Sequence, residues 1–323
     1  MRSHSFSDFD DFAESIRGVV SKMLLRNAEQ QSWRLRSVDL SGMDVQFAQL
    51  GSGNIAQGEL KADGTLVYLP LTPGVEYSAN GNVVEKGSFA ILDPGCEFCV
   101  STQVRHDWCA VTFPTHLLRT EAGVENEPDV SSANAQRPTV RTSAVNKQAA
   151  NRFREIVSQI IAVASKMDGF ESSPAALAAS SELLKVASTV LMRSSVVDRQ
   201  AGRPKVSRDQ IIARSMTHLE QHGGSAILVG DLAGAADVSE RTLRNAFGEY
   251  FGVSPVRYLL FRQLHQVHRR LRELDADEAS VTEVLVQHGV WEFGRFASRY
   301  GRLFGELPSE TLHRSRRLVH SVG

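Results

Sequence analysis

The stretch Leu228-Val-Gly-Asp-Leu-Ala-Gly-Ala-Ala-Asp-Val-Ser-Glu-Arg-Thr-Leu-Arg-Asn-Ala-Phe247 divides into two short helices separated by a turn. We expect Asp231 to cap the first helix and Ser239 to cap the second, because their side chains accept hydrogen bonds from free backbone N–H groups. Asp237-Val238 would form the turn. The small Ala and Gly residues of the first helix let the two helices cross closely. The stretch therefore predicts a helix-turn-helix.

The second of these helices has two different faces. Leu243 and Phe247 are four residues apart and are predicted to face inward, whereas Arg241, Arg244 and Asn245 lie on another face. Such a polar face is either an ordinary solvated surface or a surface that binds an acidic partner. This helix alone leaves both interpretations open.

A second stretch, Trp291-Glu-Phe-Gly-Arg-Phe-Ala-Ser-Arg-Tyr-Gly-Arg-Leu-Phe-Gly305, repeats the division. Four apolar side chains at i, i+4, i+7 and i+8 form the predicted buried stripe: Phe296, Tyr300, Leu303 and Phe304. The polar residues of a different stripe are Arg295, Ser298, Arg299 and Arg302. A short helix precedes this stretch, with Ser280 and Glu283 as a capping box and Gly289 as its end. The helix-turn-helix is therefore predicted to be duplicated.

A long helix is predicted between the two copies, from Pro255 to about Glu273. At the helical rise per residue it measures roughly 28 Å. Successive major grooves on one face of DNA lie about 34 Å apart. Two helices held apart by such a rod have the spacing to enter successive grooves.

The segment from about 208 to 315 resembles the DNA-binding domain of the AraC/XylS family of bacterial transcription regulators. Three segments carry the resemblance: Val238-Ser-Glu-Arg-Thr-Leu-Arg-Asn-Ala-Phe247, Phe251-Gly-Val-Ser-Pro-Val-Arg-Tyr258, and Gly289 through Pro308. The sequence departs from the family pattern at Gly289-Val290, where Gly-Phe is usual, and at Leu307-Pro308, where Thr-Pro is usual. These departures make base preference at the second helix less transferable.

The resemblance implies which residues contact DNA. In the first recognition helix the family's base-reading positions fall on Arg241, Arg244 and Asn245; Arg addresses guanine and Asn addresses adenine. In the second helix they fall on Phe293, Gly294, Arg295 and Ser298. Ser239 and Arg299 complete the expected DNA contacts. Because Gly294 brings no side chain, we expect the second helix to make more phosphate than base contacts.

The resemblance also implies the partners of the chain. They are double-stranded promoter DNA, a second copy in a homodimer and, for activation, RNA polymerase. Family members mostly activate and some repress, and the sequence does not decide between these. It also leaves open whether a small-molecule effector exists, so a regulator without a ligand stays an alternative.

The expected fold class is α+β, with four parts along the chain. A β-rich, cupin-like barrel or sandwich occupies 1–142, a helical dimerisation or packing region 143–195, a linker 196–207, and the all-α DNA-binding domain with two helix-turn-helix motifs 208–318. Strand patterns run from about 38 to 115, including a hairpin at Asn80-Gly81 and a strand from Gly87 that a Pro-Gly turn stops at Gly95. The polar stretch 121–142 is predicted to be a surface loop.

Two amphipathic helices are predicted in the helical region. Six apolar residues define the stripe of the first: Phe153, Ile156, Val157, Ile160, Ile161 and Ala164. Gly169 would follow it, and Ser173-Pro174 would begin a second helix that runs to about Ser194. The pair either packs on its own β-domain or forms a homodimer surface, and partial overlap of the two is allowed.

A cupin-type metalloenzyme with an appended helical domain is the alternative from another class. Such enzymes hold a metal through clustered histidines, yet no histidine occurs between His4 and His106. Cys96 and Cys99 form a C-x-x-C, but the strand alternation of Cys96 and Phe98 directs Cys99 to the opposite face, which favours buried, inert thiols. Phe89, Ile91, Phe98 and Trp108 either line a sensor pocket or pack in the core. We therefore expect no catalytic residue, no metal and no cofactor.

Composition excludes few other classes. With 42% hydrophobic and 23% charged residues, the chain is ordinary for a globular protein. A net charge of −1 conceals a basic C-terminal part, where residues 201–323 hold 17 Lys+Arg against 14 Asp+Glu. No apolar run has the length of a membrane span and the N-terminus lacks a signal-peptide pattern, so we expect a cytoplasmic protein, nucleoid-associated when bound to DNA, without a membrane partner.

Overall fold

The computed structural model describes residues 1–29, 31–84, 86, 88–121, 140–143, 147–192, 194–196, 206–222, 227–274 and 279–319. The chain forms two compact units, one from residues 1–23 and 32–199 and the other from residues 24–31 and 200–323. We call them the β-rich unit and the helical unit. None of the helices in these described ranges combines the length and apolarity that a membrane crossing requires.

Two antiparallel sheets form a cupin-like sandwich in the β-rich unit. The first sheet has the order β1 (Arg2–Phe6), β3 (Trp33–Leu40), β4 (Met43–Leu50), β11 (His106–Pro114), β6 (Gly64–Pro70), β9 (Ala90–Leu92), β12 (Val140–Ser143) and β13 (Ser194–Val196). The second has the order β2 (Val19–Leu25), β5 (Asn54–Leu60), β10 (Glu97–Thr102), β7 (Tyr77–Ala79) and β8 (Asn82–Val84). The predicted α+β class is confirmed.

The predicted hairpin is present between β7 and β8, where Ala79 pairs with Asn82. Asn80 and Gly81 have φ angles of 46° and 72°, the positive values that a two-residue hairpin turn requires. The strand expected over Gly87–Gly95 is shorter than predicted and spans only Ala90–Leu92.

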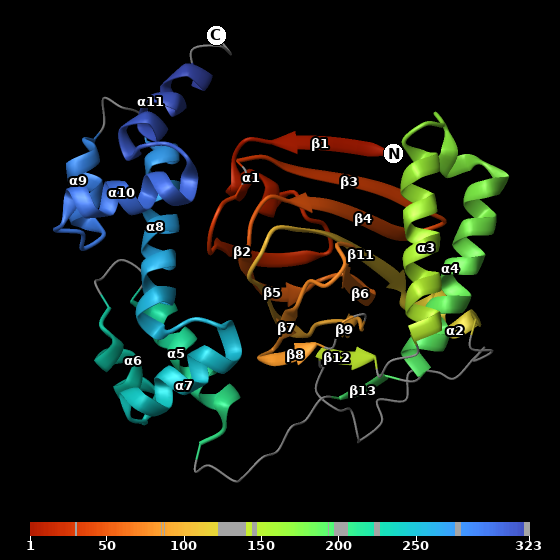
Figure 1. Cartoon of the computed structure of the whole chain (residues 1–323), viewed down its shortest axis with the longest axis horizontal. Coiled ribbons are helices and arrows are strands. Elements are labelled where there is room, and N and C mark those ends of the chain that lie inside the picture. Colours follow the sequence, from red (N-terminus) through yellow and green to blue (C-terminus); the bar gives the residue numbers. More distant parts are fainter. Residues whose placement is uncertain are drawn as a thin grey trace. The chain divides into compact units, whose positions relative to one another are not determined.

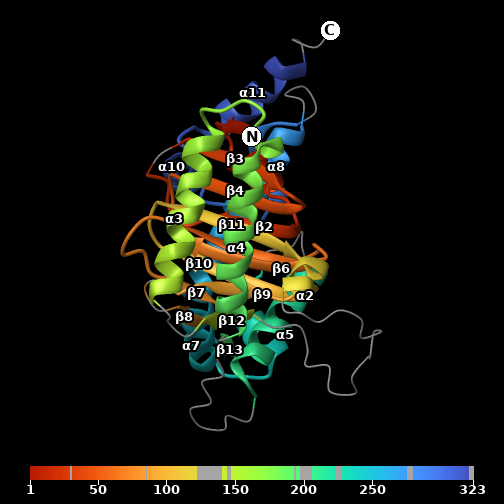
Figure 2. The same cartoon turned by 90° about the vertical axis from the view of Figure 1, so that its right-hand side faces the viewer.

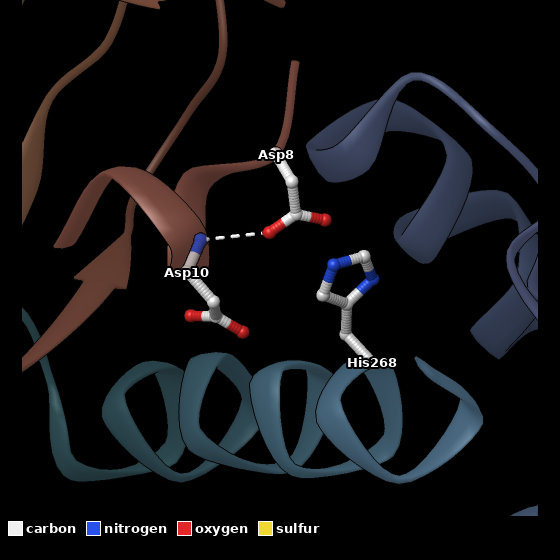
Figure 3. A group of neighbouring side chains, drawn as sticks. All are labelled: Asp8, Asp10 and His268. Carbon is white, nitrogen blue, oxygen red and sulfur yellow. Dashed lines mark hydrogen bonds between the residues drawn. The ribbon is translucent and has the colours of Figure 1, made fainter. Parts of the chain in front are cut away.

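The strands begin earlier than the predicted residue 38, because β1, β2 and most of β3 precede it. Between β1 and β2 lies α1 (Phe9–Glu14), which Asp8 caps by accepting a hydrogen bond from the Asp10 N–H at 2.9 Å (Figure 3). At the other end, the expected loop over 121–142 is wrong for residues 140–142, because they belong to β12 (Val140–Ser143), which pairs with β9 and β13. Residues 122–139 lie outside the described residues.

Helices cover one face of the eight-stranded sheet. After α2 (Thr115–Glu121) come α3 (Lys147–Ala164), the 3-10 turn η1 (Phe170–Ser172) and α4 (Pro174–Met192), and α3 and α4 lie across the strands in Figure 2. The predicted stripe of α3 is confirmed: Phe153 and Val157 are fully buried in the same core as Phe89 and Phe113 of the sheet. The helix pair therefore packs on its own β-unit.

The beginning and end of α4 differ in how well they were predicted. Ser173 caps it as expected, since its hydroxyl accepts from the Ala176 N–H at 3.1 Å. The helix ends at Met192, close to the predicted end at about Ser194. Ser194–Val196 then forms β13, so Val196 lies in a strand rather than in the predicted linker. The rest of that linker up to residue 205 lies outside the described residues.

Cys96, Cys99 and Cys109 are reduced cysteines in the interior of the β-rich unit. Burial raises the pKa of Cys96 to about 12, so this thiol stays protonated near neutral pH. Phe89, Ile91, Phe98 and Trp108 are also buried, and Phe89 and Ile91 belong to the core beneath α3 and α4.

The helical unit contains seven described helices, and the others are arranged along the long helix α8. They are α5 (Arg208–Gln221), α6 (Val229–Ala236), α7 (Glu240–Phe251), α8 (Pro255–Glu273), α9 (Val281–Gln287), α10 (Phe293–Phe304) and α11 (Pro308–Val319). In Figure 1, α5–α7 gather at one end of α8 and α9–α11 at the other. The predicted pair of helix-turn-helix motifs joined by a long helix is therefore confirmed.

Candidate nucleic-acid interface

The first helix-turn-helix consists of α6, a tight turn and α7. Asp237 has a φ of 55° and ends α6 in the left-handed region, and the Ser239 hydroxyl then accepts from the Thr242 N–H at 3.2 Å. The prediction that Asp231 is the N-cap residue of α6 was wrong, because Leu228 occupies that position. Asp231 lies in the first turn of α6 and accepts from the Leu228 N–H at 2.7 Å, because α6 begins earlier than predicted.

Helix α7 separates a buried side from a polar side. Leu243 and Phe247 are fully buried, as predicted. Three polar side chains are exposed on the remaining surface: Arg241, Arg244 and Asn245. The Arg244 guanidinium lies 3.8 Å from the Glu240 carboxylate one turn earlier, a pairing that solvent screens at this exposure. The structure thus leaves all three predicted base-reading side chains accessible.

The second helix-turn-helix consists of α9 and α10. Ser280 and Glu283 form the predicted capping box, in which the Ser280 N–H donates to the Glu283 carboxylate at 2.6 Å. Hydrogen bonds from Ser280 lower the pKa of Glu283. Gly289, with a φ of 71°, follows α9 in a conformation that favours glycine.

The predicted division of α10 is also present. Phe296, Tyr300 and Leu303 are buried, whereas Phe304 is only partly buried. The exposed candidates for DNA contact are Phe293, Gly294, Arg295 and Ser298. Arg299 is half-buried, which leaves it less free to reach a ligand than the other candidates.

Two adjacent side chains of α8 hold helices at its two ends. The Arg262 guanidinium donates to the carbonyl of Leu219 at 2.8 Å, in the last turn of α5. Gln263 donates to the carbonyl of His288 at 2.9 Å, directly after α9. The last carbonyls of a helix have no partner within it, so both side chains satisfy groups that would otherwise be unpaired. These contacts join α8 to a helix on either side of it.

Comparison with known proteins agrees with this geometry. Residues 232–314 match a protein family described as a helix-turn-helix domain. Over 103 residues the chain is 36% identical to the XylDLEGF operon transcriptional activator 3 of Pseudomonas putida, covering 32% of this chain and 31% of that protein. Residues 232–314 are therefore similar to the helix-turn-helix domain of AraC/XylS-type activators.

Two further similarities cover a larger part of this chain at lower sequence identity. The HTH-type transcriptional activator RhaS of Klebsiella pneumoniae (strain 342) is 28% identical over 166 residues, which cover 51% of this chain and 55% of that protein. The crystal structure of the AraC-like transcriptional activator CuxR is similar over 88% of this chain and 100% of that chain, with a TM-score of 0.43 and 12% identity. The match to the Pseudomonas activator spans about a third of its length.

A polar network fixes α10 within this helix-turn-helix domain. The Tyr300 hydroxyl lies 2.6 Å from Nδ1 of His268 on α8 and 2.8 Å from the Thr311 hydroxyl on α11. Thr311 in turn donates to Glu306 at 2.6 Å, and Arg314 donates to the same carboxylate at 2.9 Å. Sequence periodicity found Tyr300 only as a core residue, because its polar partners come from other helices.

Two further features of the recognition surface went unpredicted. Trp291, directly before α10, is 75% exposed, although large aromatic side chains usually bury most of their area. Arg295 donates to Glu292 at 3.2 Å, as Arg244 pairs with Glu240 in α7. The i,i+3 and i,i+4 spacings of these residues in the sequence were a signal that could have predicted both ion pairs. Each recognition helix therefore carries a carboxylate beside an arginine.

In the β-rich unit, His106 is a buried histidine at the start of β11. Its Nε2 lies 3.2 Å from the Tyr68 hydroxyl and its Nδ1 lies 3.0 Å from the carbonyl of Val104. Burial lowers the pKa of His106, against the opposing effect of the bond to Val104. Both ring nitrogens thus have protein partners, which is a structural role.

Proposed function

We propose that this chain is a sequence-specific DNA-binding transcription regulator, in the first place an activator, that binds double-stranded promoter DNA through α7 and α10. One observation carries the proposal. Both helices of the duplicated motif bury their apolar side and expose arginines, and a single helix of 19 residues joins the two motifs. A guanidinium presents paired donors that fit guanine edges and phosphates.

The two recognition helices are proposed to contribute unequally. Arg241 and Arg244 address guanine and Asn245 addresses adenine, so α7 reads sequence. In α10, Phe293 meets a thymine methyl group while Arg295 and Ser298 contact mainly phosphate. Ser239 supplies a hydroxyl at the start of α7, and Arg299 stays a candidate phosphate contact despite its partial burial.

The remaining parts of the chain are assigned in the same proposal. Residues 1–142 form a regulatory region and 143–195 support a homodimer. The segment after β13 up to residue 207 links these parts to residues 208–318, which bind DNA. Activation proceeds by contact with RNA polymerase beside the promoter, in the cytoplasm and on the nucleoid. The matched relatives from Pseudomonas and Klebsiella are transcriptional activators, which supports this direction of control.

Genome-wide mapping of the sites that the chain occupies in its host tests the proposal. We expect occupancy at a limited set of promoters that share a sequence motif. A variant with both Arg241→Ala and Arg244→Ala is expected to lose these peaks while the protein persists at normal abundance. Equal occupancy by the parent and this variant would contradict the proposal.

A cupin-type metalloenzyme stays the alternative from a different class, and the comparisons give it no support. The hydrogen bonds of His106 to Tyr68 and Val104 leave this ring oriented for structure rather than for a metal. Metal analysis of the purified full-length protein separates the two proposals. A stoichiometric transition metal would favour the enzyme.

A further inference from the structure

The β-rich unit contains a hollow of about 350 Å³ beside α3. Its apolar wall comes from Pro70 at the end of β6 and from Leu71, Pro73 and Val75 in the segment that follows. Tyr77, Ser88, Asn151 and Arg154 supply polar groups around it. Apolar walls with a few converging polar groups are typical of small-molecule sites, and this volume lies at the small end of their range.

Arg154 brings a positive charge to this hollow, and no carboxylate among the described residues balances it. Its guanidinium is half-buried, lies 6.0 Å from the centre of the Phe89 ring, and reaches the Asn151 side-chain oxygen at 3.5 Å. Within the described residues, no acidic side chain forms an ion pair with it. Burial lowers the pKa of Arg154. A partly desolvated cation without a counter-charge is unfavourable, and an anion entering the hollow would relieve this.

Ser88 supplies a second, independent indication of a ligand. It is only 3% exposed, and its hydroxyl has no hydrogen-bond partner in the described part of the chain. Its carbonyl is occupied, since it accepts from the Tyr77 hydroxyl at 3.2 Å. Buried hydroxyls nearly always have partners, so the unpartnered hydroxyl of Ser88, a residue that lines the hollow, indicates a missing acceptor.

The charge of the missing ligand follows from the other residues around the hollow. Lys86 also lines it, but the Lys86 ammonium already lies 3.1 Å from the Glu76 carboxylate. Among the described residues one uncompensated positive charge therefore remains, which matches a monoanion better than a dianionic phosphate. A guanidinium binds a carboxylate through two parallel hydrogen bonds.

We propose that this hollow binds a small organic monoanion, a carboxylate on an apolar body, with Arg154 holding the carboxylate and Ser88 donating a hydrogen bond to it. The apolar body lies against Leu71, Pro73 and Val75. The binding itself follows from the β-rich unit alone. A role for the ligand as an effector of DNA binding rests on the proposed function.

Calorimetric titration of the full-length protein tests the ligand class. The probes are hexanoate and phenylacetate, the matched neutral amides hexanamide and phenylacetamide, and acetate and inorganic phosphate. We expect saturable binding of the two larger carboxylates at millimolar concentration or below, and weak or no binding of the others. Equal binding of acid and amide, preference for phosphate, or no binding of either larger carboxylate would overturn the proposal.

Matched variants test the residues. Arg154→Gln should weaken carboxylate binding at least about tenfold, because hydrogen bonds to charged groups are among the stronger ones. Ser88→Ala should weaken it severalfold. Arg152→Gln, two residues earlier on α3, is the control, because the Arg152 guanidinium is exposed and pairs with Glu155 and Glu182 instead. Unchanged binding by Arg154→Gln would overturn the assignment.

Two readouts separate this site from a structural role and from the proposed function. Without ligand, Arg154→Gln should melt no lower than the parent, because the variant removes an unbalanced charge; a clear fall in its melting temperature would assign Arg154 to structure. DNA binding is measured on the same preparations. Failure of carboxylate binding with intact DNA binding rejects only the site, and the reverse result rejects only the proposed function.

Discussion

At the residue scale, Arg241 is the side chain whose role is easiest to separate from folding. It is exposed, while its neighbours Leu243 and Phe247 carry the packing of α7. Arg241→Ala is expected to weaken binding to the cognate site by about 1–3 kcal/mol and to flatten preference at one base pair. Fluorescence anisotropy with a set of single-base variants of the site measures both effects. Arg270→Ala is a suitable control, because this exposed arginine of α8 lies 3.7 Å from Glu273. If Arg241→Ala weakened binding equally for all sequences, the side chain would contact phosphate only.

At the element scale, the position of α9 and α10 depends on contacts that α8 makes with its middle residues. Gln263→Ala removes the donor to the His288 carbonyl and should destabilise the helical unit by about 1 kcal/mol, because a helix-terminal carbonyl loses its partner. Since α9 precedes the second recognition helix, we expect weaker binding to a full site and little change on DNA that offers only the part read by α7. Anisotropy on both duplexes checks this, with Arg262→Ala as the matched variant because it releases α5 instead. If Gln263→Ala weakened binding to both duplexes equally, the contacts of α8 with α5 and with α9 would not act independently.

Elements with local signals were the ones that the sequence predicted well. The capping box at Ser280, the Asn80-Gly81 turn and the span Pro255–Glu273 each depend on residues within a few positions of one another, and all three are present. Pairing between distant segments leaves no such local signal. β13 is three residues long and exists because Val196 pairs with Arg141, on the far side of the α3–α4 pair in the chain. The candidate anion site was missed for the same reason, since Ser88 and Arg154 come from different elements and neither has an unusual neighbour in sequence.

At the scale of the whole molecule, the proposed homodimer links the β-rich unit to DNA recognition. Three large apolar side chains around the connection of α3 to α4 are exposed: Val163 at 42%, Met167 at 45% and Leu177 at 63%. The inner sides of both helices already pack on the sheet, so only their outer surfaces are available to a second copy. Two copies on adjacent half-sites bind more tightly than one, because the second contact becomes intramolecular. A charge introduced at this surface should therefore weaken both association and DNA binding, without a large loss of fold stability.

Leu177→Asp is the corresponding variant. We expect the parent to sediment as a dimer at micromolar concentration and Leu177→Asp to shift toward monomer, with a melting temperature close to that of the parent because the replaced side chain is exposed. Its affinity should fall for DNA with two half-sites and stay nearly constant for DNA with one. Glu182→Gln, a conservative change at another exposed position of α4, controls for effects of altering this helix at all. A Leu177→Asp protein that still sediments as a dimer would place the interface elsewhere, and a monomeric parent with full affinity for two half-sites would remove dimerisation from the mechanism.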